Sequence, residues 1–114
     1  THAIKCCNKN YYVIARRGDT FQSIGKETGV SWKKLAKYNE RDKKDSLDEG
    51  DIIFLKKKRS KADKSFKNNP RTVRAGESLD SIAQKYAITL KSLYKKNNLT
   101  ADYDIRPGDI LRVY

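Results

Sequence analysis

Apolar residues recur along the chain at two spacings, which alternate in the same order in each half. Residues 11–15 and 52–55 are short runs of aromatic, β-branched and aliphatic side chains, a composition typical of strands. Between them, apolar residues three and four positions apart, such as Trp32, Leu35 and Ala36, predict helices. The second half repeats the order, with strands expected at residues 72–74 and 110–114. Each half therefore predicts strand, helix, helix and strand.

Polar residues with capping side chains precede each expected helix. A hydroxyl at the N-cap accepts a hydrogen bond from a free backbone N–H of the first turn. The four candidates are Thr20, Ser31, Ser78 and Thr89. Gly29 is expected to end the first helix, because glycine adopts the left-handed conformation at little cost. Asn39 and Asn97 are expected to end the second helix of each half, since asparagine also tolerates that conformation.

The two halves match in one constant register without a gap. Many residues are identical in the two halves at a spacing of 58 positions, including Gly18 and Gly76, Ser23 and Ser81, Ile24 and Ile82, Lys33 and Lys91, Leu35 and Leu93, Asn39 and Asn97, and the run 50–52 with the run 108–110. So many matches in one register indicate two copies of one module. Each copy has about 44 residues, near the size at which a hydrophobic core alone is marginal.

We therefore predict an α+β fold of two βααβ modules, each a two-stranded antiparallel sheet with two helices on one face. The expected division is a lead-in segment at residues 1–10, a first module at 11–55, a basic linker at 56–70 and a second module at 71–114. In the lead-in, His2, Ile4 and Cys6 alternate with polar or small residues, which is compatible with an extra strand. A disordered or truncated lead-in is an equal alternative.

The net charge of +12 permits anionic partners. Residues 56–70 contain seven basic residues and one acidic residue, so half of the excess charge lies in this segment. Nucleic-acid or other anionic-polymer binding through it is one possible function. The segment has a single aromatic residue, Phe66, and no row of stacking platforms, so a solvated linker is favoured over a specific nucleic-acid site.

The residues needed for common catalytic sites are missing. His2 is the only histidine, and there is no Ser/His/Asp set, no metal-binding spacing and no phosphate-binding loop. Cys6 and Cys7 are adjacent, so they could form only a strained bridge and no disulfide framework. We expect this chain to have no catalytic residue, no cofactor and no metal site.

Two sets of motifs carry a family resemblance. The first set is Gly-Asp-Thr-Phe-x-Ser-Ile at 18–24 with Gly-Asp-Ile at 50–52. The second set is Gly-Glu-Ser-Leu-x-Ser-Ile-Ala at 76–83 with Ile-x-Pro-Gly-Asp-x-Leu at 105–111. Each set resembles a LysM module, and together the resemblance covers about residues 13–55 and 71–114. It implies a βααβ fold that binds glycans containing N-acetylglucosamine, such as peptidoglycan or chitin. LysM pairs usually serve an enzyme in the same chain, so a glucosaminidase or amidase elsewhere in the parent protein is expected.

The resemblance also implies where the glycan binds: a shallow groove between the first strand–helix loop and the loop before the last strand. In the first module the matching residues are Gly18, Asp19, Thr20 and Phe21, facing Leu47, Asp48, Glu49, Gly50, Asp51 and Ile52. In the second they are Gly76, Glu77, Ser78 and Leu79, facing Ile105, Arg106, Pro107, Gly108, Asp109 and Ile110. Trp32 aligns with Leu90 and the seven tyrosines are scattered, so most aromatic residues are expected in the core or at its rim.

The copies differ in the second loop, where the first has Asp48-Glu49 and Arg41 and the second has Arg106-Pro107 and Leu99. We therefore expect the second module to bind glycan better. The chain begins at Thr1 and has no apolar signal segment or membrane span, so we expect a piece of a longer protein, and the missing signal says nothing about the destination of that protein. The LysM resemblance implies a cell-envelope protein, periplasmic or extracellular, and we expect this piece to be a monomer. Protein–protein scaffolding is a third functional hypothesis.

Overall fold

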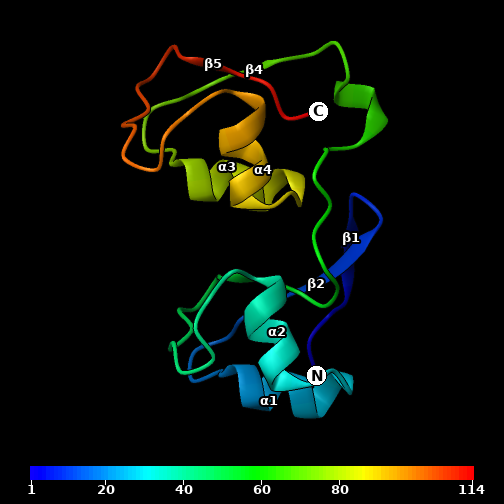
Figure 1. Cartoon of the computed structure of the whole chain (residues 1–114). Coiled ribbons are helices and arrows are strands. Elements are labelled where there is room, and N and C mark those ends of the chain that lie inside the picture. The colour runs from blue at the N-terminus through cyan, green and yellow to red at the C-terminus, as the bar shows by residue number, and fades with distance from the viewer. The chain divides into compact units, whose positions relative to one another are not determined.

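The computed structural model describes all residues from 1 to 114, and the chain divides into two compact units, Thr1–Lys58 and Arg59–Tyr114 (Figure 1). The second unit begins 58 residues after the first, which is the spacing of the sequence repeat. The first unit consists of β1 (Lys5–Cys7), β2 (Asn10–Ile14), α1 (Phe21–Thr28), α2 (Trp32–Tyr38) and β3 (Ile52–Phe54). The second consists of the 3₁₀ helix η1 (Lys64–Phe66), β4 (Arg71–Thr72), α3 (Leu79–Tyr86), α4 (Leu90–Lys96) and β5 (Ile110–Leu111).

Both units have the expected βααβ order, with the outer strands of each module paired antiparallel. In the second unit β4 pairs with β5 in a two-stranded sheet. In the first unit β2 pairs with β3, and β1 adds a third strand on the other edge of β2. The strand expected from the alternation in residues 1–10 is thus present, and the disordered alternative is wrong.

Each unit has its own hydrophobic core between its helices and its sheet. In the first unit Val13 and Ile53 of the sheet pack with Ile24 of α1 and Leu35 of α2, and Trp32 lies partly buried against this cluster. The core of the second unit contains Val73, Ile82, Ala83, Ile88, Leu93, Leu111 and Val113. The helices are only seven or eight residues long, so burial of one apolar face rather than intrinsic helix stability must hold them. None of them is long and apolar enough to cross a membrane.

Three of the four expected N-caps form as predicted. Thr20 and Ser23 bond reciprocally in a capping box at α1, and Ser78 with Ser81 does the same at α3. The hydroxyl of Thr89 accepts from the backbone N–H of Ser92 at α4. Ser31 is the exception, because its side chain makes no capping hydrogen bond at α2.

Asn39 and Asn97 end the second helix of each unit, as expected, but the expected reason, a left-handed conformation, is wrong. Neither residue is left-handed, with φ of −97° and −111°, and the left-handed residues are the next ones, Glu40 and Asn98. The Asn39 side chain instead donates to the carbonyl oxygens of Leu35 (2.7 Å) and Phe54 (2.9 Å), and accepts from the Phe54 N–H (2.8 Å). Asparagine therefore ties the end of the helix to the last strand.

Asn97 makes the same bridge in the second unit. Its side chain donates to the carbonyl oxygens of Leu93 and Arg112, both at 2.9 Å, and accepts from the Arg112 N–H at 2.8 Å. A side chain with one acceptor and two donors can complete this pattern, whereas a carboxylate or a hydroxyl of similar size cannot.

The middle of the basic segment 56–70 packs on the second unit. Ala62 is buried and its N–H donates to the Val113 carbonyl at 2.8 Å. The Phe66 ring meets the Tyr86 ring edge to face, with centroids 5.0 Å apart. Phe66 therefore acts as an apolar anchor for this segment on its own unit.

Replacing Asn39 by alanine tests the helix–strand bridge. We expect Asn39→Ala to destabilise the first unit by about 2 to 3 kcal/mol, because it leaves the buried N–H and carbonyl of Phe54 without their partner. Urea unfolding, monitored through the NMR amide signals of the first unit, measures the change in the free energy of unfolding. Lys37→Ala, at an exposed position of the same helix, is the control and should change stability by less than about 0.5 kcal/mol. Equal effects of the two substitutions would contradict the bridge.

Candidate functional site

The loops that the resemblance points to are built from one kind of turn, used twice in each unit. Every copy has glycine third and an acid fourth: residues 16–19, 48–51, 74–77 and 106–109. The glycines have φ of +88°, +94°, +83° and +97°, as a type II turn requires at its third residue. In each turn the N–H of the acid donates to the carbonyl of the first residue at 3.0 to 3.2 Å.

The acid side chain closes each turn a second time. Asp19 accepts from the Arg16 N–H and Glu77 from the Arg74 N–H, both at 2.7 Å. The second turns repeat the contact from Asp51 to the Asp48 N–H at 2.9 Å, and from Asp109 to the Arg106 N–H at 3.0 Å. Asp19 and Glu77, the two acids that lie beside helix N-termini, therefore use their carboxylates to close the turn.

In each unit the second turn is hydrogen-bonded to the residue that directly precedes the first turn. Ala15 accepts from the Gly50 N–H and donates to the Asp51 carbonyl, both at 2.8 Å. Val73 makes the equivalent pair with Gly108 and Asp109, at 2.9 and 2.8 Å. This pairing places the first strand–helix loop beside the loop before the last strand.

In the second unit these two loops border a hollow of about 390 Å³. Glu77, Ser78, Leu79 and Asp80 line it from the first loop and the start of α3, and Asp104 and Ile105 line it from the second loop. Leu90 and Tyr94 of α4 and Tyr103 complete the lining. The hollow is shallow and combines apolar and aromatic residues with hydroxyl and carboxylate groups.

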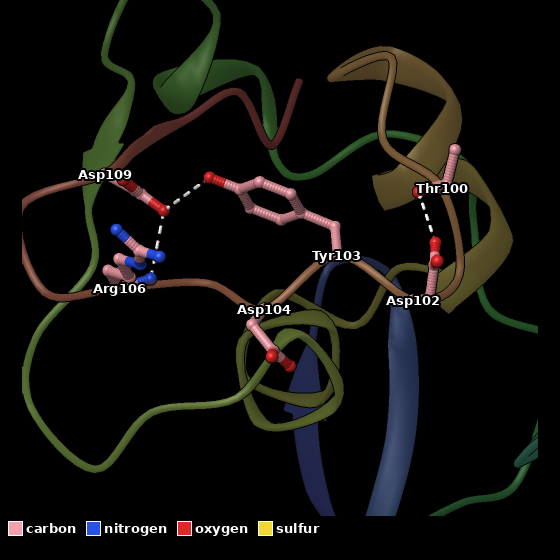
Figure 2. A pocket seen from close by; sticks show the side chains of 6 residues that line it. All are labelled: Thr100, Asp102, Tyr103, Asp104, Arg106 and Asp109. Atoms are coloured by element: carbon pink, nitrogen blue, oxygen red, sulfur yellow. Dashed lines mark hydrogen bonds between the residues drawn. The ribbon is translucent and has the colours of Figure 1, made fainter.

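A second hollow of about 540 Å³ shares Tyr103 and Asp104 with the first, and Thr100, Asp102, Arg106 and Asp109 complete its polar lining (Figure 2). The Tyr103 hydroxyl donates to the Asp109 carboxylate at 2.9 Å, and this bond raises the pKa of Tyr103. The Arg106 N–H and the Tyr103 hydroxyl together lower the pKa of Asp109. Tyr103, whose residue surface is 42% exposed, is thereby fixed between the two hollows.

The expected site residues of the second unit fall into three groups. Glu77, Ser78, Leu79 and Ile105 line the first hollow. Arg106 and Asp109 line the second. Gly76, Pro107, Gly108 and Ile110 belong to the turns and the strand that position these residues.

In the first unit the second loop is held by Arg41. Its guanidinium binds the Asp51 carboxylate at 3.0 Å and the Ser46 carbonyl at 2.7 Å, and lies 5.9 Å from the centre of the Phe21 ring. Phe21 itself is buried in the core. Arg41 therefore binds the same turn acid in the first unit that Tyr103 binds in the second.

The rest of the expected first-unit site is spread over this region. Gly18, Asp19 and Thr20 form the turn and cap before α1, Leu47 is buried in the core, and Glu49 and Gly50 line a hollow of about 320 Å³ with Arg16 and His2. Asp48 and Ile52 belong to the second turn and to β3.

Five residues that line the first hollow were not candidates in the sequence analysis: Asp80, Leu90, Tyr94, Tyr103 and Asp104. The aromatic residues among them are Tyr94 and Tyr103. Both are in the second unit only, since Ala36 and Asp45 occupy their positions in the first. That difference between otherwise matching copies was a usable signal. The scatter of the seven tyrosines along the chain hides this signal.

The turn carboxylates predict how stability depends on pH. Hydrogen bonding from the Arg74 N–H lowers the pKa of Glu77, and hydrogen bonding from the Arg106 N–H lowers that of Asp109. A lowered pKa stabilises the fold above the unfolded value of about 4, and the contribution is lost as the pH falls through the folded value. We therefore expect the melting temperature of the second unit to fall between about pH 5 and pH 2.

Glu77→Gln should make this acid-induced loss smaller, because the amide cannot be protonated in that range. Asp80→Asn, which changes an exposed carboxylate at the start of α3, is the matched control. Thermal unfolding at a series of pH values measures both. If the melting temperature of Glu77→Gln falls with pH as steeply as that of the unsubstituted chain, the turn does not depend on the Glu77 carboxylate.

The sequence matches the LysM domain family over residues 13–56 and 72–113. Cell wall-binding protein YocH of Bacillus subtilis (strain 168) is 31% identical over 101 residues, which cover 89% of this chain and 33% of that protein. Membrane-bound lytic murein transglycosylase D of Escherichia coli (strain K12) is 31% identical over 109 residues, covering 94% of this chain and 23% of that protein.

Among solved structures, the spore cortex-lytic enzyme SleL of Bacillus cereus is 28% identical, with a TM-score of 0.40, and the match covers 98% of this chain and 22% of that one. This chain spans about a third or less of the length of each of these relatives. The family match covers both βααβ units and includes the turns that border the hollows. The chain therefore belongs to the LysM domain family and carries two LysM domains in tandem.

Proposed function

We propose that the chain is a non-catalytic binding unit for the N-acetylglucosamine glycans of peptidoglycan, and that the second unit is the stronger binder. The observation that carries the proposal is the hollow between the two loops of the second unit. It lies where the LysM resemblance implies a groove, and its walls are partly apolar.

The chemistry of the hollow suits an acetamido sugar. The acetyl methyl group needs an apolar contact, which Leu79, Leu90 and Ile105 offer. The acetamide N–H and carbonyl need one acceptor and one donor, and hydroxyl, carboxylate and loop backbone groups surround the hollow. The exposed ring of Tyr103 offers a flat face to the C–H groups of a pyranose ring.

The first unit lacks several of these features. Asp45 stands in place of Tyr103, and Arg41 binds the turn acid Asp51. A weaker site there would still add to the overall affinity, since tethering raises the effective concentration for the second contact. The chain would then act as a bivalent monomer.

The relatives suggest what the unit is attached to. One is a cell wall-binding protein and another is a lytic murein transglycosylase, and this chain matches only part of each. We infer that the chain directs an attached peptidoglycan hydrolase to the cell wall, in the periplasm or outside the cell. Chitin is a related polymer that the same groove would fit, because it contains the same acetamido sugar.

Substitution of Tyr103 tests the site. We expect Tyr103→Ala to weaken binding of an N-acetylglucosamine tetramer to the second unit by about tenfold, because the aromatic wall is lost. Tyr103→Phe keeps the ring and loses only the bond to Asp109, so it should retain most of the affinity. Amide shift titrations by NMR give the affinity and the location together.

Tyr11→Ala is the control, since Tyr11 is an exposed tyrosine of the first unit outside the loops. It should leave the affinity of the second unit unchanged. Shifts confined to the first unit, or equal binding by Tyr103→Ala and the unsubstituted chain, would contradict the assignment. Binding of random DNA in preference to the tetramer would favour the anionic-polymer alternative.

A further inference from the structure

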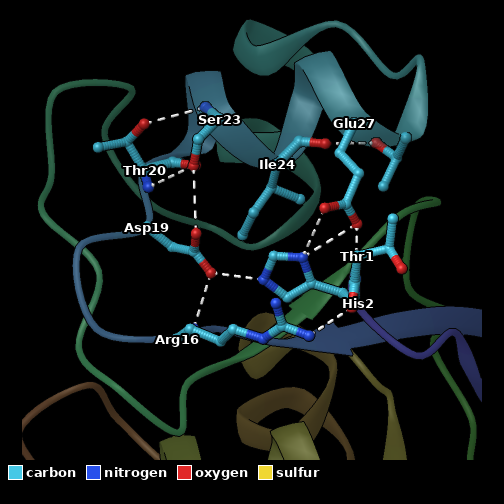
Figure 3. Close-up of polar contacts among 9 residues, drawn as sticks. Thr1, His2, Arg16, Asp19, Thr20, Ser23, Ile24 and Glu27 are labelled. Carbon is cyan, nitrogen blue, oxygen red and sulfur yellow. Dashed lines mark hydrogen bonds and ion pairs between the residues drawn. The ribbon is translucent and has the colours of Figure 1, made fainter.

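The side chain of His2 lies between two carboxylates of the first unit (Figure 3). Its Nε2 is 2.6 Å from Asp19 Oδ2, and its Nδ1 is 3.0 and 2.9 Å from the two oxygens of Glu27. The imidazole is only 8% exposed. Sequence reasoning gave this residue no role, because nothing near it in the chain is its partner.

The geometry requires a protonated ring. A carboxylate can only accept hydrogen bonds, so both ring nitrogens must donate for both contacts to form. A neutral imidazole has one donor and one acceptor, and its acceptor nitrogen would face a carboxylate oxygen. Loss of the ring proton therefore breaks one of the two contacts.

The His2 contact bears directly on the first loop. Asp19 Oδ2, which His2 approaches, is also the atom that closes the turn by accepting from the Arg16 N–H. The backbone N–H of His2 donates to Glu27 at 2.9 Å, and the Arg16 guanidinium donates to the Thr1 carbonyl. The start of the chain is thus fastened across the turn that precedes α1.

The second unit holds the equivalent acid with a different cation. Glu77 accepts from the Arg74 N–H, as Asp19 does from Arg16, but its ion-pair partner is the guanidinium of Arg71. Arg71 lies on β4 and stacks 5.5 Å from the centre of the Tyr86 ring. Arginine stays charged at every physiological pH, whereas histidine does not.

We propose that His2 is a pH-responsive clamp on the first loop of the first unit, so that this unit binds glycan more tightly when His2 is protonated. The second unit, clamped by Arg71, would keep its affinity over the same range. The chain would then engage glycan through both units in mildly acidic conditions and mainly through the second in alkaline ones. This regulation rests on the proposed glycan-binding function.

The charged groups around the His2 ring determine which protonation state of His2 forms the clamp. Hydrogen bonds to Glu27 and then to Asp19 raise the pKa of His2 above its usual 6.5. Burial acts to raise the pKa of Asp19, but bonds from the Arg16 N–H and His2 outweigh it and lower the pKa overall. The backbone N–H of His2 and then its side chain lower the pKa of Glu27 by hydrogen bonding.

Both carboxylates therefore stay ionised while His2 titrates. The clamp is complete below about pH 6.5 and is lost as the pH rises through the raised pKa of His2. Loosening the turn reduces the fraction of the first unit whose loop is ordered for binding, and the apparent affinity falls by that fraction.

The clamp is tested first in the ligand-free chain by comparing it with His2→Gln at about pH 6. The Asp19 N–H donates to the Arg16 carbonyl at 3.0 Å, and we expect it to exchange with solvent at least threefold faster in the variant. The Glu77 N–H in the second unit is the internal reference and should not change. Equal Asp19 exchange in both chains would overturn the clamp.

The second arm measures binding of an N-acetylglucosamine tetramer at about pH 6 and about pH 9. We expect the dissociation constant of the first unit to rise roughly threefold to tenfold, with a midpoint at the pKa of His2, and that of the second to stay constant. His2 is the only histidine, so its ring signals report that pKa without overlap. His2→Gln should show the weaker first-unit affinity at both pH values.

His2→Gln changes only the side chain that forms the clamp, so it separates the effect of His2 from other effects of pH. A first-unit affinity that is independent of pH, or that changes equally in the variant, would overturn the proposed regulation. If neither unit binds the tetramer at either pH, the proposed function fails, and with it the regulation of binding. The exchange comparison still decides separately whether His2 clamps the loop.

Discussion

The structure depends on one local arrangement, a type II turn with glycine third and an acid fourth whose side chain bonds back to the first amide. A module of this size has a small core, so its loops cannot rely on burial to stay in place. The carboxylate supplies an acceptor for an N–H that would otherwise need water, and it does so within four residues. Pairing of the second turn with Ala15 or Val73 then fixes the two loops beside each other. The position of the hollow in the second unit follows from these few hydrogen bonds.

The two copies keep this backbone and differ in which side chains hold the acids. The second-turn acid binds a guanidinium in the first unit (Arg41 to Asp51) and a phenol in the second (Tyr103 to Asp109). The first-turn acid binds an imidazole in the first unit (His2 to Asp19) and a guanidinium in the second (Arg71 to Glu77). Each of these contacts is a side-chain choice that leaves the turn itself unchanged. The copies can therefore diverge in ligand contacts and in pH response without a change of fold.

Most of the fold was predictable from the sequence because the signals for it are local. Hydrophobic spacing, the capping hydroxyls at Thr20 and Ser78, and the Gly-acid turns each act within a few residues. What could not be predicted depends on partners far apart in the chain. Asn39 reaches Phe54 fifteen residues away, and His2 reaches Glu27 twenty-five residues away. The role of Tyr103 in the candidate site could not be predicted for the same reason, because it depends on the loops and the helix that surround this residue in the fold.

A site made from two turns also explains why small changes in side chains should matter for binding. Such a groove has no deep cavity to enclose a sugar, so affinity depends on how well the loops are ordered before the ligand arrives. In the second unit the ordering groups are an arginine and a tyrosine, which keep their protonation state near neutral pH. In the first unit one of them is a histidine, whose charge changes in that range. Under the proposed regulation, two copies of one backbone would combine a constant binding site with an adjustable one, and the tether between them would pass a change in one site on to the affinity of the whole chain.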